Sequence, residues 1–405
     1  MNKPGFLSLK DFHYDLPEER IARYPLPERD SSRLLVFKEN QISTDIFANL
    51  ASHIPSGSHL VFNETKVIHA RIKFKKQTGA AIEIFCLEPF VPFDYQQNFA
   101  SRQTVTWKCL VGNSKKWKEE VLEKKADNGL TLYAIKKGRM EGAFRIEFSW
   151  TQPELSFSEV IEAFGSTPIP PYLNREAEYS DSENYQTVYS KNEGSVAAPT
   201  AGLHFTENLL ADISAGGIEK SFLNLHVGAG TFVPVKSENA VEHEMHIERI
   251  VVSKNCIEKL LDKHTTIIPV GTTSCRSLES LYWIGQQMIN GTFEPASPLL
   301  KQWDAYSIPA SEDRGKVLET LLDYLDRSGE EELTVSTGIM ITPGYEFKMT
   351  DALITNFHQP SSTLLMLIAA LTGESWRSIY AYALSHDFRF LSYGDSNLLF
   401  PASCD

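Results

Sequence analysis

The sequence predicts an α/β fold, in which a main α/β layered domain is interrupted by an inserted small antiparallel β-barrel domain. Residues 71–150 contain short alternating strands separated by turn-forming stretches, without helical periodicity, which is typical of a small barrel. The flanking segments alternate apolar strands with amphipathic helices, as α/β layer folds do. The 405 residues are enough for two cores. We therefore expect one domain at 71–150 and a discontinuous main domain at 1–70 plus 151–405.

The inserted segment also differs from the rest of the chain in charge. It holds 15 Lys and Arg against 9 Asp and Glu, whereas the whole chain has a formal net charge of −13. Because exposed charges are screened beyond about 10 Å at ordinary salt, a locally basic segment can bind nucleic-acid phosphates on an acidic protein. The alternative is a lysine-rich solvated surface without a partner.

Individual elements follow from the hydrophobic periodicity. In the inserted segment, strands are expected at Arg71–Phe74, Ala81–Leu87, Thr104–Val111, Leu130–Lys136 and Ala143–Phe148. In the main domain, strands are expected at Leu60–Phe62, Ser221–Val227, Thr265–Val270, Leu333–Ser336 and Arg389–Tyr393. Apolar residues at helical spacing predict helices at Glu207–Ala215, Arg276–Ile289, Asp313–Arg327, Ser362–Leu371 and Ser375–Ser385.

Composition and cysteine usage limit the class of protein. No apolar run approaches the roughly 20 residues that span a bilayer, and the N-terminus has no apolar signal core. The five cysteines are scattered and never spaced C-x-x-C, which argues against a disulfide framework and against a zinc ribbon. We expect a cytoplasmic protein with no membrane partner.

Two segments rich in glycine and histidine are too polar for plain core. The first, 194–206, contains Thr200, Gly202 and His204. Small residues let the backbone approach a ligand, and histidine titrates near neutrality, although a tight turn with a capping histidine is the alternative. The second, 225–232, follows a predicted strand and lacks the third glycine and following helix of a dinucleotide fingerprint, so it is a weak cofactor signal.

A third segment leads from a predicted strand through a small polar loop into a helix. Gly271, Thr272, Thr273 and Ser274 precede Arg276 in this loop. Backbone N–H groups and the helix dipole favour an anion at such a position, and arginine binds carboxylate or phosphate with two hydrogen bonds. No Walker lysine follows, so nucleoside triphosphate binding is not indicated. Ordinary helix capping by Thr and Ser is the alternative.

Two further polar segments complete the candidate site. Asn356 and His358 lie in a loop before an apolar helix, and Tyr393 and Asp395 lie in the C-terminal tail. We expect no metal centre, because the H-E-x-H spacing at 243–246 differs from the H-E-x-x-H that aligns two ligands one helical turn apart. No G-x-S-x-G elbow occurs, which argues against a serine hydrolase.

Taken together, these strings closely resemble the S-adenosylmethionine:tRNA ribosyltransferase-isomerase family of queuosine biosynthesis. The matching strings run along the whole chain in the order that the family shows. They are FHYDLPEERIA at 12–22, YPLPERDSSRL at 24–34, LVFNET at 60–65, YQTVY at 185–189, the segments 194–206, 225–232 and 271–280, MH at 245–246, PGY at 343–345, TNFH at 355–358 and SYGD at 392–395.

The resemblance implies an α/β domain with an inserted β-barrel, in agreement with the boundary in texture and charge. It also implies a reaction that transfers and isomerises the ribosyl moiety of S-adenosylmethionine onto 7-aminomethyl-7-deazaguanine at the tRNA wobble position. The products are epoxyqueuosine-tRNA, adenine and methionine. S-adenosylmethionine is then a consumed co-substrate, no separate cofactor is needed, and a monomer is the expected state.

This chemistry needs a base at C5′ of the sugar, an acid that assists adenine departure and an anchor for the methionine carboxylate. We assign acid and base roles to His204, His226 and His246, and anion anchoring to the segment 271–276. The remaining candidate substrate contacts are Thr200, Gly202, Gly228, Gly230, Thr231, Asn356, His358, Tyr393 and Asp395. Candidate contacts to tRNA phosphates are Lys73, Lys75, Lys76, Lys115, Lys116 and Lys118.

The chain departs from the family pattern at several positions. It has His69 in place of Pro, Val233 in place of Arg, Ile247 in place of Ser, Cys275 in place of Val and Ser361 in place of Lys. Two of these changes remove a positive charge. Two alternatives therefore stay open: a divergent paralogue that cleaves S-adenosylmethionine on another substrate, and a tRNA-binding protein without catalysis.

Overall fold

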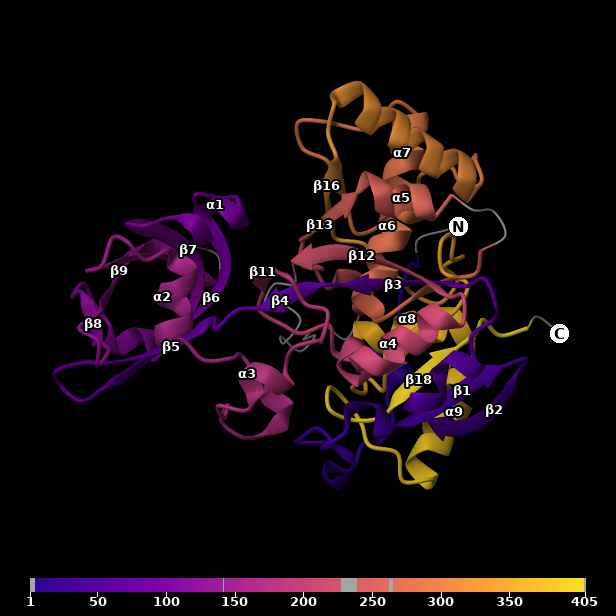
Figure 1. The fold of residues 1–405 in the computed structure, drawn as a ribbon, viewed down its shortest axis with the longest axis horizontal. Helices are drawn as coiled ribbons and strands as arrows, with labels where there is room; N and C mark the ends of the chain where they lie inside the picture. Colours follow the sequence, from indigo (N-terminus) through magenta and orange to yellow (C-terminus); the bar gives the residue numbers. More distant parts are fainter. Residues whose placement is uncertain (1–3, 141, 227–238, 262–264, 404–405) are drawn as a thin grey trace.

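The structure is a computed structural model that describes residues 4–140, 142–226, 239–261 and 265–403. Two bodies stand side by side, a small barrel and a larger mixed α/β body that carries both chain ends (Figure 1). This arrangement confirms the predicted fold class, an α/β protein with an antiparallel barrel in addition. Among the described residues, no helix is long and apolar enough to cross a membrane.

The barrel is a sheet of six described antiparallel strands in the order β5-β6-β7-β10-β9-β8. The strands are β5 (Arg71–Lys75), β6 (Ala81–Val91), β7 (Thr104–Gly112), β8 (Leu122–Lys125), β9 (Thr131–Met140) and β10 (Ala143–Trp150). Strands β5 and β8, at the two ends of this order, approach each other and nearly close the barrel. Alternate side chains such as Ile82 and Ile84 point inward and are fully buried, which explains the alternation in the sequence.

Two short helices complete the barrel. Helix α1 (Tyr95–Ala100) lies between β6 and β7, and α2 (Phe157–Phe164) follows β10. Helix α2 begins at a capping box formed by Ser156 and Glu159, and buries its apolar face in the barrel core. The predicted boundaries at 71 and 150 stay a prediction, and the packing of α2 extends the barrel core beyond residue 150.

The described residues of the main body form three sheets. A mixed sheet has the order β14-β3-β12-β13-β16-β15, a second has β17-β18-β1-β2, and a two-stranded sheet pairs β11 with β4. Their bounds are β14 (Ile267–Pro269), β3 (His59–Asn63), β12 (Glu219–His226), β13 (Glu248–Ser253), β16 (Glu332–Thr337), β15 (Leu299–Leu300), β17 (Leu353–Asn356), β18 (Ser396–Leu399), β1 (Arg33–Lys38), β2 (Gln41–Ile46), β11 (Asn192–Ser195) and β4 (Thr65–Val67).

The α-helices of this body cover the sheets, and α6 is buried along nearly all of its length. They are α3 (Asp181–Asn184), α4 (Glu207–Ala215), α5 (Lys254–Lys259), α6 (Thr272–Ile289), α7 (Arg314–Ser328), α8 (Thr363–Thr372) and α9 (Ser375–Ser385). The apolar residues of α6 join one large core with the mixed sheet, α7 and α8. Each predicted helix is found, but α6 begins four residues earlier than predicted, at Thr272.

One predicted strand is wrong. Residues Arg389–Tyr393 form a turn with a single bridge between Ile21 and Phe390, and the strand of this tail is β18 further along the chain. Leu391 has a positive φ of 70°, which no strand accepts. The apolar residues of this segment are buried in a turn, and their pattern in the sequence resembles that of a strand.

The position of the site follows from the parallel part of the mixed sheet. Strand β3 pairs in parallel with both β14 and β12, so the carboxyl ends of all three lie at one edge. A parallel bridge between Val270 and Ile354 joins this edge to β17. In sheets of this kind, ligands bind outside the carboxyl ends of the strands.

Candidate active site

Three of the predicted polar segments meet at this carboxyl edge. The N–H of Gly271 donates to the carbonyl of Ile354 over 2.7 Å, which ties the start of α6 to the end of β17. A Cβ on Gly271 would lie 3.6 Å from the Cβ of Ala201, in the 3-10 turn Thr200–His204. Gly271 has a φ of 91°, a conformation that favours glycine and turns the chain into the helix. The segments 199–204, 270–276 and 354–358 are thus neighbours.

The N-terminus of α6 is the segment for which the sequence predicts an anion site. Thr272, Thr273 and Ser274 form the first turn, and no side chain caps it. The hydroxyl oxygens of Thr273 and Ser274 are buried and have no hydrogen-bond partner. Amide groups at a helix start attract negative charge, and hydroxyl groups without an internal partner are able to hydrogen bond to a polar ligand.

Arg276 lies one turn further along α6 and is 7% exposed. Its Nη1 donates to Oε2 of buried Glu248 over 2.6 Å, and its Nε donates to the carbonyl of Ile339 over 3.3 Å. Its Nη2 is buried and has no partner. The sequence suggested that the guanidinium binds an anion with two hydrogen bonds. It is not free to do so, because Glu248 occupies one of its nitrogens. One donor of the guanidinium, Nη2, remains without a hydrogen-bond partner.

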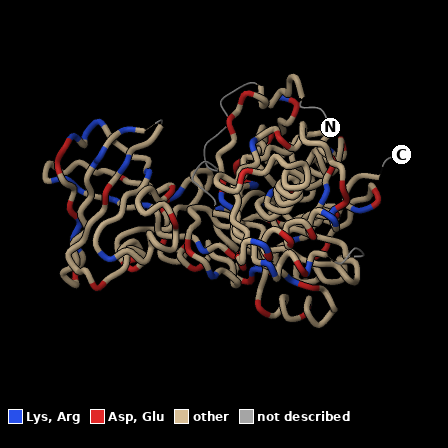
Figure 2. Tube along the Cα trace, turned by 90° about the horizontal axis from the view of Figure 1, so that it is seen from above, with Lys and Arg blue, Asp and Glu red and all other residues tan. Residues whose placement is uncertain are grey.

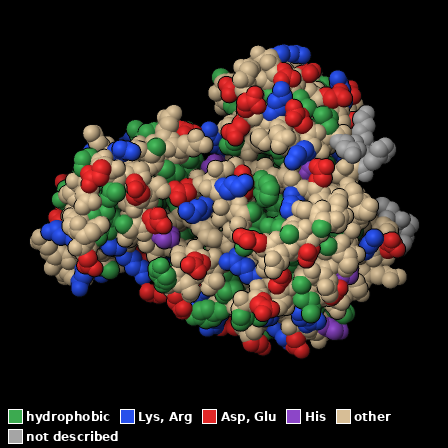
Figure 3. All heavy atoms as spheres, viewed as in Figure 1, with side chains coloured by type: hydrophobic (Ala, Val, Ile, Leu, Met, Phe, Trp, Pro, Cys, Tyr) green, Lys and Arg blue, Asp and Glu red, His purple; other side chains and the backbone are tan. Residues whose placement is uncertain are grey.

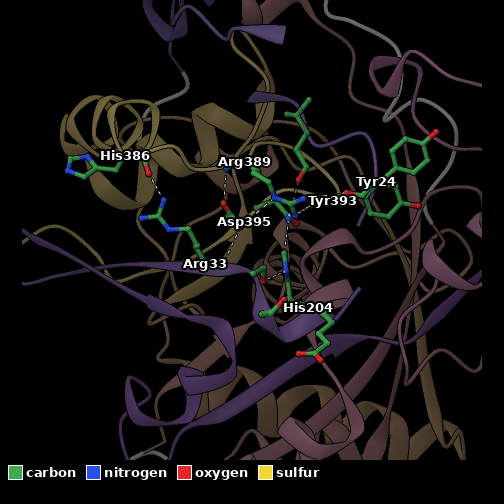
Figure 4. A network of polar contacts seen from close by, with 12 residues as sticks. Tyr24, Arg33, His204, His386, Arg389, Tyr393 and Asp395 are labelled. Atoms are coloured by element: carbon green, nitrogen blue, oxygen red, sulfur yellow. Dashed lines mark hydrogen bonds and ion pairs between the residues drawn. The ribbon is translucent and has the colours of Figure 1, made fainter. Parts of the chain in front are cut away.

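His204 is held at both ring nitrogens in the network of Figure 4. Its Nδ1 lies 2.8 Å from the hydroxyl of Ser32, and its Nε2 lies 3.0 Å from Nδ2 of Asn356. The side-chain nitrogen of Asn356 is a donor only, and it also donates to the carbonyl of Leu391. Nε2 of His204 is therefore the acceptor, and the ring proton resides on Nδ1. Burial, with smaller effects of nearby arginines, lowers the pKa of His204 to about 3, so the ring is neutral near pH 7.

Tyr393 and Asp395 hold the C-terminal tail in place through hydrogen bonds. The carboxylate of Asp395 accepts from the backbone N–H of Arg33 over 3.0 Å and of Arg389 over 2.7 Å. The hydroxyl of Tyr393 donates to Asp181 over 3.0 Å. Figure 4 shows both residues beside Arg389, above His204. Their contacts explain their buried position and connect the tail to β1 and α3.

His226 stands where the main body meets the barrel. Its ring stacks on Tyr95 of α1, with centroids 4.3 Å apart and planes 8° apart, and its Nδ1 lies 3.2 Å from the carbonyl of Gly194. A Cβ on Gly194 would lie 2.3 Å from Nδ1, so only glycine fits there. The neighbouring pair Arg249–Asp94 spans the same junction at 3.2 Å. Burial lowers the pKa of His226 to about 4.

The other two histidines differ in exposure. His246 is exposed and follows a segment held by Gln302, whose side chain donates to the carbonyl of His243 over 2.7 Å. His358 is buried, its Nε2 lies 3.1 Å from the hydroxyl of Thr355, and burial lowers its pKa to about 4. Within the described residues, no hydrogen bond or ring contact joins His204, His226 and His246 to one another.

The small residues of the candidate site are only partly described. Thr200 is half-buried at the start of its 3-10 turn. Gly202 lies against Tyr189, and a Cβ would come within 1.9 Å of the tyrosine hydroxyl, so close packing alone requires glycine there. Three residues predicted from the segment 225–232 lie outside the described residues: Gly228, Gly230 and Thr231.

Two of the six lysines predicted to contact tRNA phosphates already form contacts within the protein. Lys76 forms an ion pair with Glu120 and donates to the carbonyl of Lys116, so it is not a free phosphate contact. Lys73 pairs with Glu176 at 3.2 Å on the surface. The other four are exposed: Lys75, Lys115, Lys116 and Lys118. Basic residues run along the barrel strands (Figure 2), and on the face drawn in Figure 3 they are interspersed with acidic ones.

Sequence reasoning missed the partners of the predicted residues. Ser32 is 172 positions from His204, and Glu248 is 28 positions from Arg276. No local spacing connects such pairs, although Ser32 lies within one of the strings that carry the resemblance. Among the described residues, no three His, Cys, Asp or Glu side chains gather as a metal site would require.

Comparisons with known proteins agree with the resemblance. A family model described as queuosine biosynthesis protein matches residues 9–399. Proteins named S-adenosylmethionine:tRNA ribosyltransferase-isomerase from Acinetobacter baumannii strains AYE and SDF are each 39% identical over 400 residues. The match covers 97% of this chain, and 99% and 97% of those proteins.

A solved structure also matches. The crystal structure of S-adenosylmethionine tRNA ribosyltransferase from Thermotoga maritima is 29% identical, with a TM-score of 0.45, and the match covers 96% of this chain and 99% of that one. The family model and the A. baumannii proteins both match over nearly the whole length of the chain. The chain therefore belongs to the queuosine biosynthesis protein family.

Proposed function

We propose that the protein transfers and isomerises the ribosyl moiety of S-adenosylmethionine onto 7-aminomethyl-7-deazaguanine at the tRNA wobble position. The products are epoxyqueuosine-tRNA, adenine and methionine, and S-adenosylmethionine is consumed without a resident cofactor. Family membership and the names of the A. baumannii relatives support this activity. We also propose a cytoplasmic location, since the acceptor is tRNA.

The observation that carries the proposal is the unfilled polar start of α6. The start of α6 lies at the carboxyl edge of β14 and β3. The donors of residues 272–276 are the amide groups of Thr272 to Ser274, two hydroxyl groups and Nη2 of Arg276, and none of them has a described partner. This donor set suits the carboxylate of the methionine moiety. A carboxylate held there fixes one end of S-adenosylmethionine, and the ribose can then be oriented toward the incoming base.

The histidines divide into two groups by their environment. His204 has both ring nitrogens occupied and a strongly lowered pKa, so we propose that it positions Asn356, whose Oδ1 is buried without a partner. His226 and His246 keep the acid and base roles in the proposal. His226 has one ring nitrogen, Nε2, without a described hydrogen bond, and its pKa of about 4, lowered by burial, keeps the ring unprotonated at pH 7.

A direct assay tests the proposal. The purified protein is incubated with S-adenosylmethionine labelled in the adenine and with tRNA that carries the aminomethyl deazaguanine. Adenine release that requires this tRNA, with a modified tRNA as product, supports the proposal. Adenine release without tRNA dependence would indicate another substrate, and tRNA binding without turnover would indicate a binding protein.

Replacing His226 by phenylalanine should separate proton transfer from packing. The phenyl ring keeps the stack on Tyr95 and removes both ring nitrogens. If His226 transfers a proton, adenine release falls by about 10²- to 10⁴-fold while the melting temperature changes little. The matched control is His386→Phe, because His386 also stacks on a tyrosine, Tyr382, but is exposed. Equal rates for the two variants would exclude the proposed role.

Charge reversal on the barrel should weaken tRNA binding. Each phosphate contact contributes about 0.7–0.9 to the slope of log affinity against log salt, so Lys75→Glu, Lys115→Glu and Lys116→Glu together should flatten the slope by about 2. Binding is measured at salt concentrations from about 50 to about 200 mM, a range over which phosphate contacts change the affinity strongly. Lys316→Glu on α7, far from the barrel (Figure 1), is the control. A slope equal to that of the control moves the tRNA surface elsewhere.

A further inference from the structure

A cavity of about 360 Å³ lies beside the barrel, between β5 and the segment that leads from α2 toward α3. Four cationic side chains line it, and two carboxylates, Glu83 and Glu176, lie among them. The cations are Arg71, Lys73, Lys124 and Arg175. None of the predicted site residues except Lys73 belongs to this cavity.

Lys124 is the most unusual of these cations. Its Nζ donates to the carbonyl of Phe164 over 2.7 Å, and no described carboxylate forms an ion pair with it. The side chain is half-buried, and its pKa is lowered by burial and by nearby Lys73. An ammonium group that has lost part of its hydration without gaining a counter-ion is destabilised, and a bound anion would relieve this cost.

Arg71 supplies a second donor in the lining of the cavity. Its Nη1 lies 3.4 Å from Glu83, and its guanidinium lies 5.0 Å from the centroid of the Phe85 ring. Its Nε is buried and has no partner. Lys73 can also turn inward, because its partner Glu176 is 87% exposed and such surface pairs contribute little. The cavity therefore offers several donors to one anion.

The cavity is also connected to the candidate active site. Arg175 binds Asp181 through two hydrogen bonds of 2.6 and 2.7 Å. Asp181 in turn accepts from the hydroxyl of Tyr393, whose carbonyl accepts from Arg389. Hydrogen bonds thus link the lining of the cavity to the C-terminal tail beside His204 (Figure 4).

We propose that the cavity binds a backbone phosphate of the tRNA, with Lys124 and Arg71 as its main donors. This inference rests on the proposed function, because it names a contact of the same acceptor tRNA. A phosphodiester carries one negative charge and accepts several hydrogen bonds, which suits a cavity lined by a half-buried ammonium and by an arginine that has one nitrogen without a hydrogen-bond partner. It adds a buried contact to the exposed lysines of the barrel.

Two neighbouring lysines of β8 provide the test. Lys124→Gln removes the proposed contact, whereas Lys125→Gln removes an exposed lysine that pairs with Glu123. With the acceptor tRNA, Lys124→Gln should weaken binding by about tenfold and lower the salt slope by about 1, as expected for one lost phosphate contact. Lys125→Gln should match the wild type, and Lys124→Arg should restore most of the affinity. Equal binding by Lys124→Gln and Lys125→Gln would overturn the proposal.

Two further measurements separate the possible failures. At saturating tRNA, Lys124→Gln should release adenine at close to the wild-type rate, because it affects binding and not the reacting groups. If the wild type binds tRNA but releases no adenine, the proposed function fails while the salt slopes still decide the phosphate site. Inorganic phosphate is titrated as well: phosphate binding that requires Lys124, together with unchanged tRNA binding, would indicate a small-anion site and overturn the proposal.

Discussion

Replacing Arg276 by methionine is expected to lower the free energy of unfolding by about 3–5 kcal/mol and to abolish adenine release. The stability loss follows from Glu248, which is 5% exposed and accepts a 2.6 Å hydrogen bond from Arg276. Without the guanidinium, its charge would be buried and unpaired. The activity loss follows from the proposed anchoring of the methionine carboxylate at the start of α6.

A double variant distinguishes these two consequences. Arg276→Met combined with Glu248→Gln removes both charges, and replacing both members of a buried pair is often close to neutral in stability. We expect the double variant to regain most of the stability measured by urea unfolding but none of the adenine release. Recovery of both properties would show that Arg276 acts only through the fold. Unchanged stability of the single variant would contradict the burial of the pair.

The barrel was predicted well because its strands have one face buried. In β6, Ile82 and Ile84 alternate with exposed or half-buried residues, so the period of two is visible in the sequence. The same criterion failed for β8, Leu122–Lys125, because only Leu122 is buried among its four residues. Its position is set by pairing with β9, which the segment itself does not reveal.

The candidate site was predicted in its segments but not in its pairs. Glycine-rich and hydroxyl-rich loops at the carboxyl ends of strands indicate a ligand site, and 199–204, 270–276 and 354–358 do lie together. The state of each side chain depends on partners that only the fold supplies. Ser32 and Asn356 occupy both nitrogens of His204, and Glu248 occupies one nitrogen of Arg276.

The side-chain contacts at the junction between the two bodies could not be predicted from the sequence either. His226 stacks on Tyr95, which belongs to α1, between the barrel strands β6 and β7. Composition separates the barrel from the main body, but it does not show which side chains join them. The stack and the neighbouring Arg249–Asp94 pair therefore became visible only in the structure.

Acidification should destabilise the protein through its buried histidines. Burial lowers the pKa of His204 to about 3 and of His358 to about 4, below the value of about 6.5 expected in the unfolded chain. At pH values between these folded and unfolded pKa values, the unfolded chain therefore binds more protons than the folded protein. The stability contributed by the neutral rings is complete above about pH 6.5 and is lost as the pH falls, by about 2 kcal/mol for each ring at pH 5.

Two buried carboxyl groups act in the opposite direction. Burial raises the pKa of Glu279 and of Asp395, so their protonation favours the folded state as the pH falls. The contribution of these two groups to the pH dependence therefore opposes that of the histidines. Single histidine variants isolate the histidine contribution, because they leave both carboxyl groups unchanged.

In His358→Gln, the difference in unfolding free energy between pH 7 and pH 5 should shrink by about 2 kcal/mol relative to the wild type. A glutamine amide does not titrate and can still hydrogen bond to the hydroxyl of Thr355, the partner of Nε2. Exposed His386→Gln is the control. Urea unfolding at both pH values measures the difference. The same pH dependence in wild type and His358→Gln would mean that His358 is as easily protonated in the folded protein as in the unfolded chain.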